Sequence, residues 1–198
     1  IAGVSVIAWV LPISRGPRLA HRMMTEGPSL HWNHVRWYGQ VLNDNLVKEL
    51  VSILVGQGYR AVAPEKTPFF KTFDLSDGRN SNWSHRHVAY AAGLGTFSLN
   101  GSLITTKGMA IRCDSMVTDL KLPPTPRTYS SHTDNCRFLS DGTCGLCAAR
   151  CPAGAITAQG RNKRLCQKEH RVTQKPWLEK PGYIAKFGVA GCGLCQTR

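Results

Sequence analysis

The sequence predicts a mixed α/β (α+β) fold in two parts, on three observations. An apolar run at residues 4–11, an amphipathic helical pattern at residues 43–58 and a second apolar run at residues 59–63 follow one another. That order is typical of a strand–helix–strand crossover unit. The Pro-rich residues 121–126 then form a stiff linker, and seven of the eight cysteines follow it. We therefore predict an α/β domain over residues 1–126 and a cysteine-rich domain over residues 127–198.

The first apolar run ends at Pro12 and has the pattern of a central strand that is covered on both faces. Residues 15–28 mix glycine, proline and basic residues without a clear period, which indicates a loop or a short helix. His31 and His34 lie at helical spacing. Because no cysteine or carboxylate shares that spacing, we expect ordinary surface or half-buried histidines rather than metal ligands.

The predicted helix at residues 43–58 has apolar side chains three and four positions apart, at Leu46, Val47, Leu50, Val51, Leu54 and Val55. Asn43 or Asp44 can cap its start, and Gly58 can supply the left-handed residue at its end. Residues 59–63 then indicate a strand that Pro64 ends.

Residues 64–82 are predicted to be a polar loop, a place where a site is expected in an α/β domain. The candidates to line it are Asp74, Asp77, Arg79, His85 and Arg86. The alternative is a solvated connector.

A helix is predicted to begin at Ser84 and to end at Gly93-Leu-Gly95. Asn100-Gly101 turns the chain into a short extended segment at residues 102–105, and residues 108–120 resemble a further strand. Cys113 lies on that strand, where a buried free thiol is favoured over a metal ligand.

The clearest chemical signal lies in the four cysteines between residues 136 and 151. Cys144, Cys147 and Cys151 keep the last spacings of the bacterial ferredoxin run C-x2-C-x2-C-x3-C-P. In that run three thiolates bind one [4Fe–4S] cluster and the fourth binds a neighbouring cluster. The first gap is wider, but Asp141-Gly142 allows the insert to turn back, so that Cys136 still reaches Cys144 and Cys147.

A second cluster needs further ligands, and Cys166, Cys192 and Cys195 complete a set of four with Cys151. The other set, Cys136, Cys144 and Cys147, is one ligand short. We expect its fourth thiolate just beyond Arg198, with Cys113 as the alternative. Because residue 1 is an isoleucine that nearly abuts a strand, we also expect an N-terminal piece before it.

Two other interpretations of the cysteines are weaker. Zinc sites use paired C-x2-C knuckles, which the x3-C-P ending and the division into three plus four fit poorly. A disulfide framework needs an exported, oxidising setting, and no signal peptide indicates one. We therefore predict two [4Fe–4S] clusters in a cytoplasmic protein, without a transmembrane segment because no apolar run is long enough.

The chain is strongly basic, with 25 Lys and Arg against 12 Asp and Glu and a formal net charge of +13. Two thiolate-bound clusters would offset roughly two charges each. The remaining charge suits a redox partner protein with an acidic surface, docked on the basic residues 161–171 around Cys166. RNA is the alternative polyanion, but no RNA-binding signature appears.

Several stretches together resemble one group of proteins: residues 86–95, residues 100–105, residues 117–120 and the cysteine runs. They resemble the epoxyqueuosine reductases and the related reductive dehalogenases, and in particular a short branch of iron–sulfur proteins without helical repeats. The resemblance covers residues 84–198, with weaker similarity before them.

This resemblance implies a nitroreductase-like α/β domain that holds a corrinoid (cobalamin), followed by a ferredoxin-like domain whose two clusters deliver single electrons to cobalt. The residues that match the family's corrinoid-binding region are Arg86, Gly93, Gly95, Asn100 and Gly101; small residues let a large macrocycle approach the backbone.

The chain also departs from these families. Epoxyqueuosine reductases carry an aspartate proton donor before the Ala-Gly-Leu-Gly turn, but the aligned position here falls near Arg79. Asp77 is therefore our candidate for the proton donor. The helical repeats that hold tRNA in those enzymes and the twin-arginine segment of the dehalogenases do not occur in this sequence.

Three functions follow as hypotheses. The first is a corrinoid- and iron–sulfur-dependent reductase of a small-molecule or tRNA substrate. The second is a ferredoxin-like electron-transfer protein without a corrinoid, which docks an acidic redox partner. The third is tRNA binding in support of nucleoside reduction.

Overall fold

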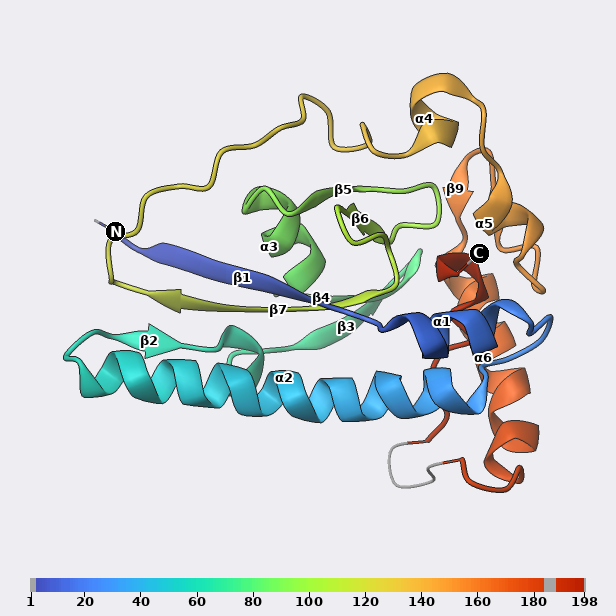
Figure 1. Ribbon diagram of the computed structural model, residues 1–198, viewed down its shortest axis with the longest axis horizontal. Helices are drawn as coiled ribbons and strands as arrows, with labels where there is room; N and C mark the ends of the chain where they lie inside the picture. The colour runs from blue at the N-terminus through green and yellow to red at the C-terminus, as the bar shows by residue number, and fades with distance from the viewer. Residues whose placement is uncertain (1–2, 184–187, 198) are drawn as a thin grey trace.

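The computed structural model describes residues 3–183 and 188–197 and has a mixed α+β architecture (Figure 1). Its main sheet has three strands, in the order β1 (Ser5–Pro12), β7 (Ile111–Thr118) and β2 (Ala61–Val62). Both outer strands are antiparallel to β7. They are therefore parallel to one another, which is the relation that the predicted strand–helix–strand crossover requires.

The prediction that the first strand is central is wrong, because β7 lies in the middle of the sheet and β1 at its side. Val6 of β1 is accordingly 44% exposed. An apolar run indicates burial, but the position of a strand depends on its pairing partner. That partner lies about a hundred residues further along the chain, where a local pattern does not reach.

Helix α2 (Leu30–Gly56) runs along the sheet and begins well before the predicted residue 43. Ser29 caps it, because its side-chain oxygen accepts a hydrogen bond from Trp32 N at 3.2 Å. Asn43, the predicted cap, lies buried in mid-helix and accepts a hydrogen bond from Trp9 Nε1 at 3.1 Å. The end of the helix is as predicted: Gly58 follows it with a φ of +88°.

Two apolar clusters attach α2 to the sheet. Val47 and Leu54 are buried against Met116 of β7. Near the start of α2, Trp32 packs with Ile13, Ala110 and Ala190. Since Ala190 belongs to the cysteine-rich part, this cluster joins the two parts of the chain.

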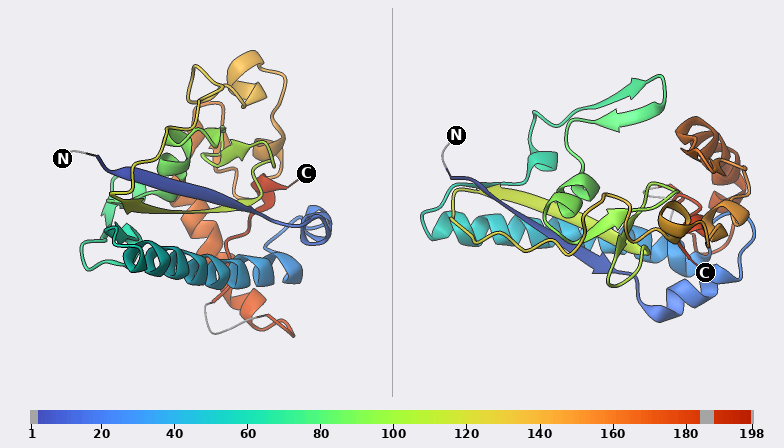
Figure 2. Two further views of the ribbon diagram at one scale, coloured as in Figure 1. Left: turned by 60° about the vertical axis from the view of Figure 1, so that its left-hand side comes forward. Right: turned by 90° about the horizontal axis from the view of Figure 1, so that it is seen from above.

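The middle of the chain forms short elements: α1 (Arg15–Arg22) before α2, and then η1 (Pro64–Lys66), β3 (Thr72–Leu75), β4 (Gly78–Ser81), α3 (His85–Ala91), β5 (Gly95–Phe97) and β6 (Leu103–Thr105). The region predicted as a polar loop thus contains the β3–β4 hairpin, which projects from the molecule (Figure 2). Gly78, with a φ of +118°, follows its two-residue turn. Helix α3 follows Ser84 as predicted.

The cysteine-rich part gathers at one end of the sheet (Figures 1 and 2). Its elements are α4 (Arg137–Asp141), α5 (Leu146–Ala149), β8 (Ile156–Thr157), β9 (Gly160–Arg161), α6 (Lys163–Leu178) and η2 (Leu194–Gln196). The connection from β7 to α4 is fastened to α3, because the Arg127 guanidinium donates to Ala91 O at 2.9 Å. Within the described residues, no helix combines the length and the apolar character needed to cross a membrane.

Candidate functional site

The C-terminal cysteines lie on short elements joined by tight turns. Cys136 precedes α4, Cys147 belongs to α5, Cys166 to α6 and Cys195 to η2. Gly142 ends α4 with a φ of +74°, so the insert after Cys136 turns back where the sequence predicts. All eight cysteines are free thiols.

The cysteines influence the pKa values of one another mainly within two neighbouring groups, the predicted sets of three and four. Burial raises the pKa of Cys147, and Cys136 and Cys144 raise it further. Burial raises the pKa of Cys195 to about 12, with additional contributions from Cys192 and Cys166. Cys151 in turn acts on Cys166 and Cys192, whose pKa values burial also raises. Cys147 also raises the pKa of Cys195, so the two predicted sets adjoin one another, and their assignment to two clusters stays a prediction.

The sulfurs lie further apart than those around one bound zinc ion. Tetrahedral zinc with Zn–S bonds of about 2.3 Å holds its sulfurs about 3.8 Å apart. In the part of the chain that the structure describes, which includes all eight cysteines, no three sulfurs lie within 4.8 Å of one another. The sulfurs are therefore not arranged as around one bound zinc ion, and a donor set of thiolates alone is the one that iron–sulfur clusters use.

The protein surrounds these thiols with apolar contacts and hydrogen bonds. Cys136 is buried with Leu99 and Ile156. Ala155 N donates to Cys151 Sγ at 3.3 Å, a contact that stabilises a thiolate. Arg150 Nε donates to Leu194 O at 3.0 Å and so attaches α5 to the turn between Cys192 and Cys195.

Asn100 connects the β5–β6 turn to the four-cysteine group, through Cys195. It is fully buried; its Oδ1 accepts from Ser102 N at 2.8 Å, and its Nδ2 donates to Cys195 O at 2.8 Å. Arg86 donates to Gly101 O, and burial lowers the pKa of this arginine. The predicted residues Arg86, Asn100 and Gly101 are thus brought together, next to the cysteines.

The glycines of this region are required by the packing of the chain on itself. A Cβ at Gly95 would stand 2.2 Å from Ile104 O, and one at Gly93, whose φ is +83°, would stand 3.2 Å from Pro126 O. A cavity of about 630 Å³ lies elsewhere, against Arg22, Met23 and Arg150. Packing of the chain on itself therefore accounts for both glycines.

The remaining predicted residues are dispersed. Asp77 is exposed on the β3–β4 hairpin, where Lys163 Nζ lies 2.6 Å from its Oδ2. That hydrogen bond lowers the pKa of Asp77, which keeps the carboxylate charged. Asp74 is exposed on β3, and Arg79 donates to Thr72 Oγ1 at 3.2 Å. Cys113 lies on β7, and burial raises its pKa to about 11.

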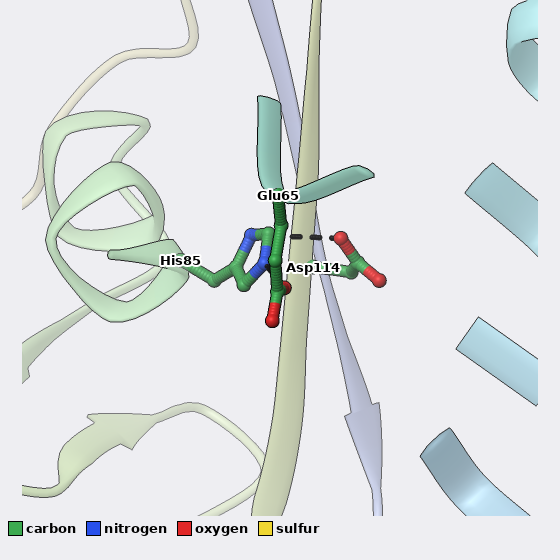
Figure 3. Close-up of side chains that lie close together, drawn as sticks. All are labelled: Glu65, His85 and Asp114. Atoms are coloured by element: carbon green, nitrogen blue, oxygen red, sulfur yellow. Dashed lines mark hydrogen bonds and ion pairs between the residues drawn. The ribbon is translucent and has the colours of Figure 1, made fainter. Parts of the chain in front are cut away.

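A second polar group lies at the open edge of the main sheet, where His85 stands between two carboxylates (Figure 3). Its Nε2 pairs with Glu65 Oε2, and its Nδ1 lies 2.8 Å from Ser115 Oγ and 3.5 Å from Asp114 Oδ1. The hydrogen bond from His85 lowers the pKa of Glu65, whereas burial raises that of Asp114. The three side chains come from η1, α3 and β7.

The early end of β2 creates this group. Val62 pairs with Val117, and Pro64 then stops the strand, so the edge of β7 beyond Met116 has no backbone partner. If the register continued, Glu65 would stand opposite Asp114. The side chains of Glu65 and His85 occupy that edge instead.

Among the predicted site residues only His85 belongs to this group; Glu65 and Asp114 were missed. One signal was available for each of them. Asp114 is an acidic residue in the middle of a strand, and Glu65 directly follows the proline that ends another strand. Their proximity depends on strand pairing.

No protein-family model matches the sequence. The tetrachloroethene reductive dehalogenase of Dehalobacter restrictus is 38% identical over 95 residues, which are 47% of this chain and 16% of the dehalogenase. A tetrachloroethene reductive dehalogenase of Desulfitobacterium hafniense matches to the same extent. The match thus spans only 16% of the length of these relatives.

Two solved structures share the fold. An epoxyqueuosine reductase from Bacillus subtilis, with its catalytic loop swung out of the active site, has a TM-score of 0.50 and 21% identity. An epoxyqueuosine reductase with an epoxyqueuosine-modified tRNA-Tyr stem loop has a TM-score of 0.50 and 20% identity. Each comparison covers 98% of this chain and 46% of the other. The predicted resemblance to both families is confirmed, and the shared fold is α+β.

Proposed function

We propose that this chain is an iron–sulfur oxidoreductase that passes single electrons through two [4Fe–4S] clusters. The observation that carries the proposal is the gathering of seven free thiols into two neighbouring groups. The likeness to epoxyqueuosine reductases and reductive dehalogenases supports it. In this proposal residues 1–126 form a nitroreductase-like domain and residues 127–198 a ferredoxin-like domain.

The ligand assignment follows the two groups. Cys151, Cys166, Cys192 and Cys195 hold one cluster, and Cys136, Cys144 and Cys147 supply three thiolates to the other. When bound, such clusters supply one-electron transfer with little change of structure. Leu99 and Ile156 pack around Cys136 and keep water from the three-cysteine group. The backbone N–H of Ala155 stabilises the Cys151 thiolate.

The electron acceptor separates the two main candidates. The resemblance points to a corrinoid, with Asp77 as the proton donor and an epoxyqueuosine tRNA or a small molecule as substrate. One observation gives the second candidate, electron transfer without a corrinoid, its support. Gly93 and Gly95 are packed against Pro126 O and Ile104 O rather than around a cavity. We therefore limit the mechanism to the two clusters.

The first test is the metal content of anaerobically reconstituted protein. We expect iron and inorganic sulfide for two clusters in the parent protein, and about half of both in Cys195→Ser, because one complete set loses a ligand. Cys113→Ser should keep both clusters, and loss of one cluster in this variant would assign Cys113 as the fourth ligand of the three-cysteine set. Equal iron in all three proteins, or zinc in place of iron, would disprove the assignment. Corrinoid absorption after reconstitution with cobalamin would select the corrinoid-dependent reductase.

An electron-transfer role also predicts a partner with an acidic surface. The basic stretch at residues 161–171 is partly engaged within the molecule, because Arg164 Nε donates to Ser76 O at 2.6 Å and Lys163 pairs with Asp77. The net charge of the whole chain, +13, still favours an electron donor protein with an acidic surface.

A further inference from the structure

We propose that Glu65, His85 and Asp114 form a binding site for one divalent first-row metal ion, separate from the cysteine groups. They are the one group of three or more His, Cys, Asp and Glu residues, within the described ranges, whose ligand atoms all lie within 4.8 Å of one another. Around a common ion with bonds of about 2.1 Å, ligand atoms lie about 3 to 4 Å apart. Glu65 faces Nε2 of His85 and Asp114 Oδ1 lies 3.5 Å from Nδ1, so the imidazole and the Glu65 side chain would turn to place all three groups around one ion.

The imidazole is held as in a metal-binding histidine. Such a histidine binds the ion through one ring nitrogen, and the other nitrogen hydrogen-bonds to a group that fixes the ring. Here Nδ1 lies 2.8 Å from Ser115 Oγ, which is itself held by Trp83 Nε1 at 3.1 Å. Nε2 faces Glu65 (Figure 3), so an ion bound between them would take the place of the direct contact between the two side chains.

Asp114 contributes a buried carboxylate to the group. It is only 3% exposed, and its Oδ2 is buried without a hydrogen-bond partner. A buried carboxylate oxygen without a partner is costly, and a bound cation removes that cost. The neighbouring cation Lys66 is directed to Asp44, at 2.6 Å.

The ligand set indicates which ions fit. Two carboxylates with one neutral imidazole carry two negative charges, which a divalent ion balances. One nitrogen and two oxygen ligands suit manganese, ferrous iron or zinc, with water in the remaining positions. Glu65 is partly exposed, with 34% of its side chain accessible, so the ion has a route from solvent.

The test uses Mn²⁺, because this ion avoids thiolates and leaves the cysteines to the clusters. Mn²⁺ is titrated into the cluster-loaded, oxidised protein, and free Mn²⁺ is followed by electron paramagnetic resonance. We expect one Mn²⁺ to bind per chain. Glu65→Gln should weaken this binding at least about tenfold, because it removes a ligand that carries charge.

Two further variants keep the test decisive. Asp77→Asn removes one exposed carboxylate outside the site and should bind Mn²⁺ like the parent protein. Asp114→Asn should weaken binding like Glu65→Gln. If Asp114→Asn does not fold, Glu65→Gln alone decides the outcome. Equal Mn²⁺ binding by the parent protein and Glu65→Gln would overturn the proposal and leave the three residues as an ion pair only.

Discussion

At the scale of single residues, the molecule depends on a few buried polar side chains that join distant segments. Asn100 is the clearest case, because one amide holds both its own turn and the backbone of Cys195. His85 joins η1 to β7 in a similar way. Each of these side chains is oriented by more than one partner, which fixes a single position.

We expect Asn100→Ala to destabilise the protein by about 2 to 4 kcal/mol, because Ser102 N–H and Cys195 C=O lose a buried partner. Urea unfolding measures this loss. The cluster that Cys195 helps to hold should also be lost more readily on exposure to air. Asn45→Ala, at an exposed position of α2, should change the free energy of unfolding by less than about 0.5 kcal/mol. Equal stability of the two variants would contradict this role of Asn100.

At the scale of elements, α2 supports both parts of the molecule. Its second half packs on the sheet through Val47 and Leu54, and its first turn packs on the C-terminal part through Trp32. A Cβ at Gly193 would stand 2.4 Å from the Trp32 ring, so the turn between Cys192 and Cys195 lies directly on the start of this helix. The position at which α2 begins therefore affects the cysteine groups.

Ser29, which caps α2, should therefore contribute measurably to the free energy of unfolding. Ser29→Ala removes the side-chain acceptor for Trp32 N and should cost about 1 kcal/mol of unfolding free energy. Ser14→Ala is a matched control, because Ser14 stands at the same position before α1 without a side-chain hydrogen bond. Thermal and urea unfolding of both variants give the comparison. A loss in Ser14→Ala as large as that in Ser29→Ala would show that the cap is not the cause.

At the scale of the whole molecule, the last residues return to the beginning of the chain. Asn33 Oδ1 accepts from Ala190 N at 2.7 Å, and Trp177 Nε1 donates to Pro28 O at 2.6 Å. Trp32 and Trp177 are buried by these contacts. The cysteine-rich part has little apolar core of its own, so its order depends on bound metal and on this docking.

Removal of the clusters by an iron chelator should therefore loosen the docking as well as the metal site. We expect a lower melting temperature and a red shift of tryptophan emission, because Gly193 moves away from the Trp32 ring. Trp32→Phe should reduce the shift, and Trp83→Phe should keep most of it, since Trp83 lies at the sheet edge. Unchanged emission on complete loss of iron would contradict this coupling.

Local patterns were enough to predict several features. Apolar spacing predicted the second half of α2, Gly58 its end, Ser84 the start of α3 and Asp141-Gly142 the turn between Cys136 and Cys144. These features depend on residues within a few positions of one another, so the sequence contains their cause. The predicted division of the cysteines into two sets also rests on spacing, and iron binding itself stays a prediction.

The sequence by itself determined the second half of α2, the start of α3, the basic charge and the thiols available for metal. Only the tertiary structure decided which strand is central, that Ser29 rather than Asn43 begins α2, and that Glu65, His85 and Asp114 meet. Each of these depends on contacts between residues far apart in the chain. Val62 must pair with Val117 before Pro64 can leave the edge of β7 open to two side chains. Pairing of that kind follows from the packing of the whole molecule, which no local pattern contains.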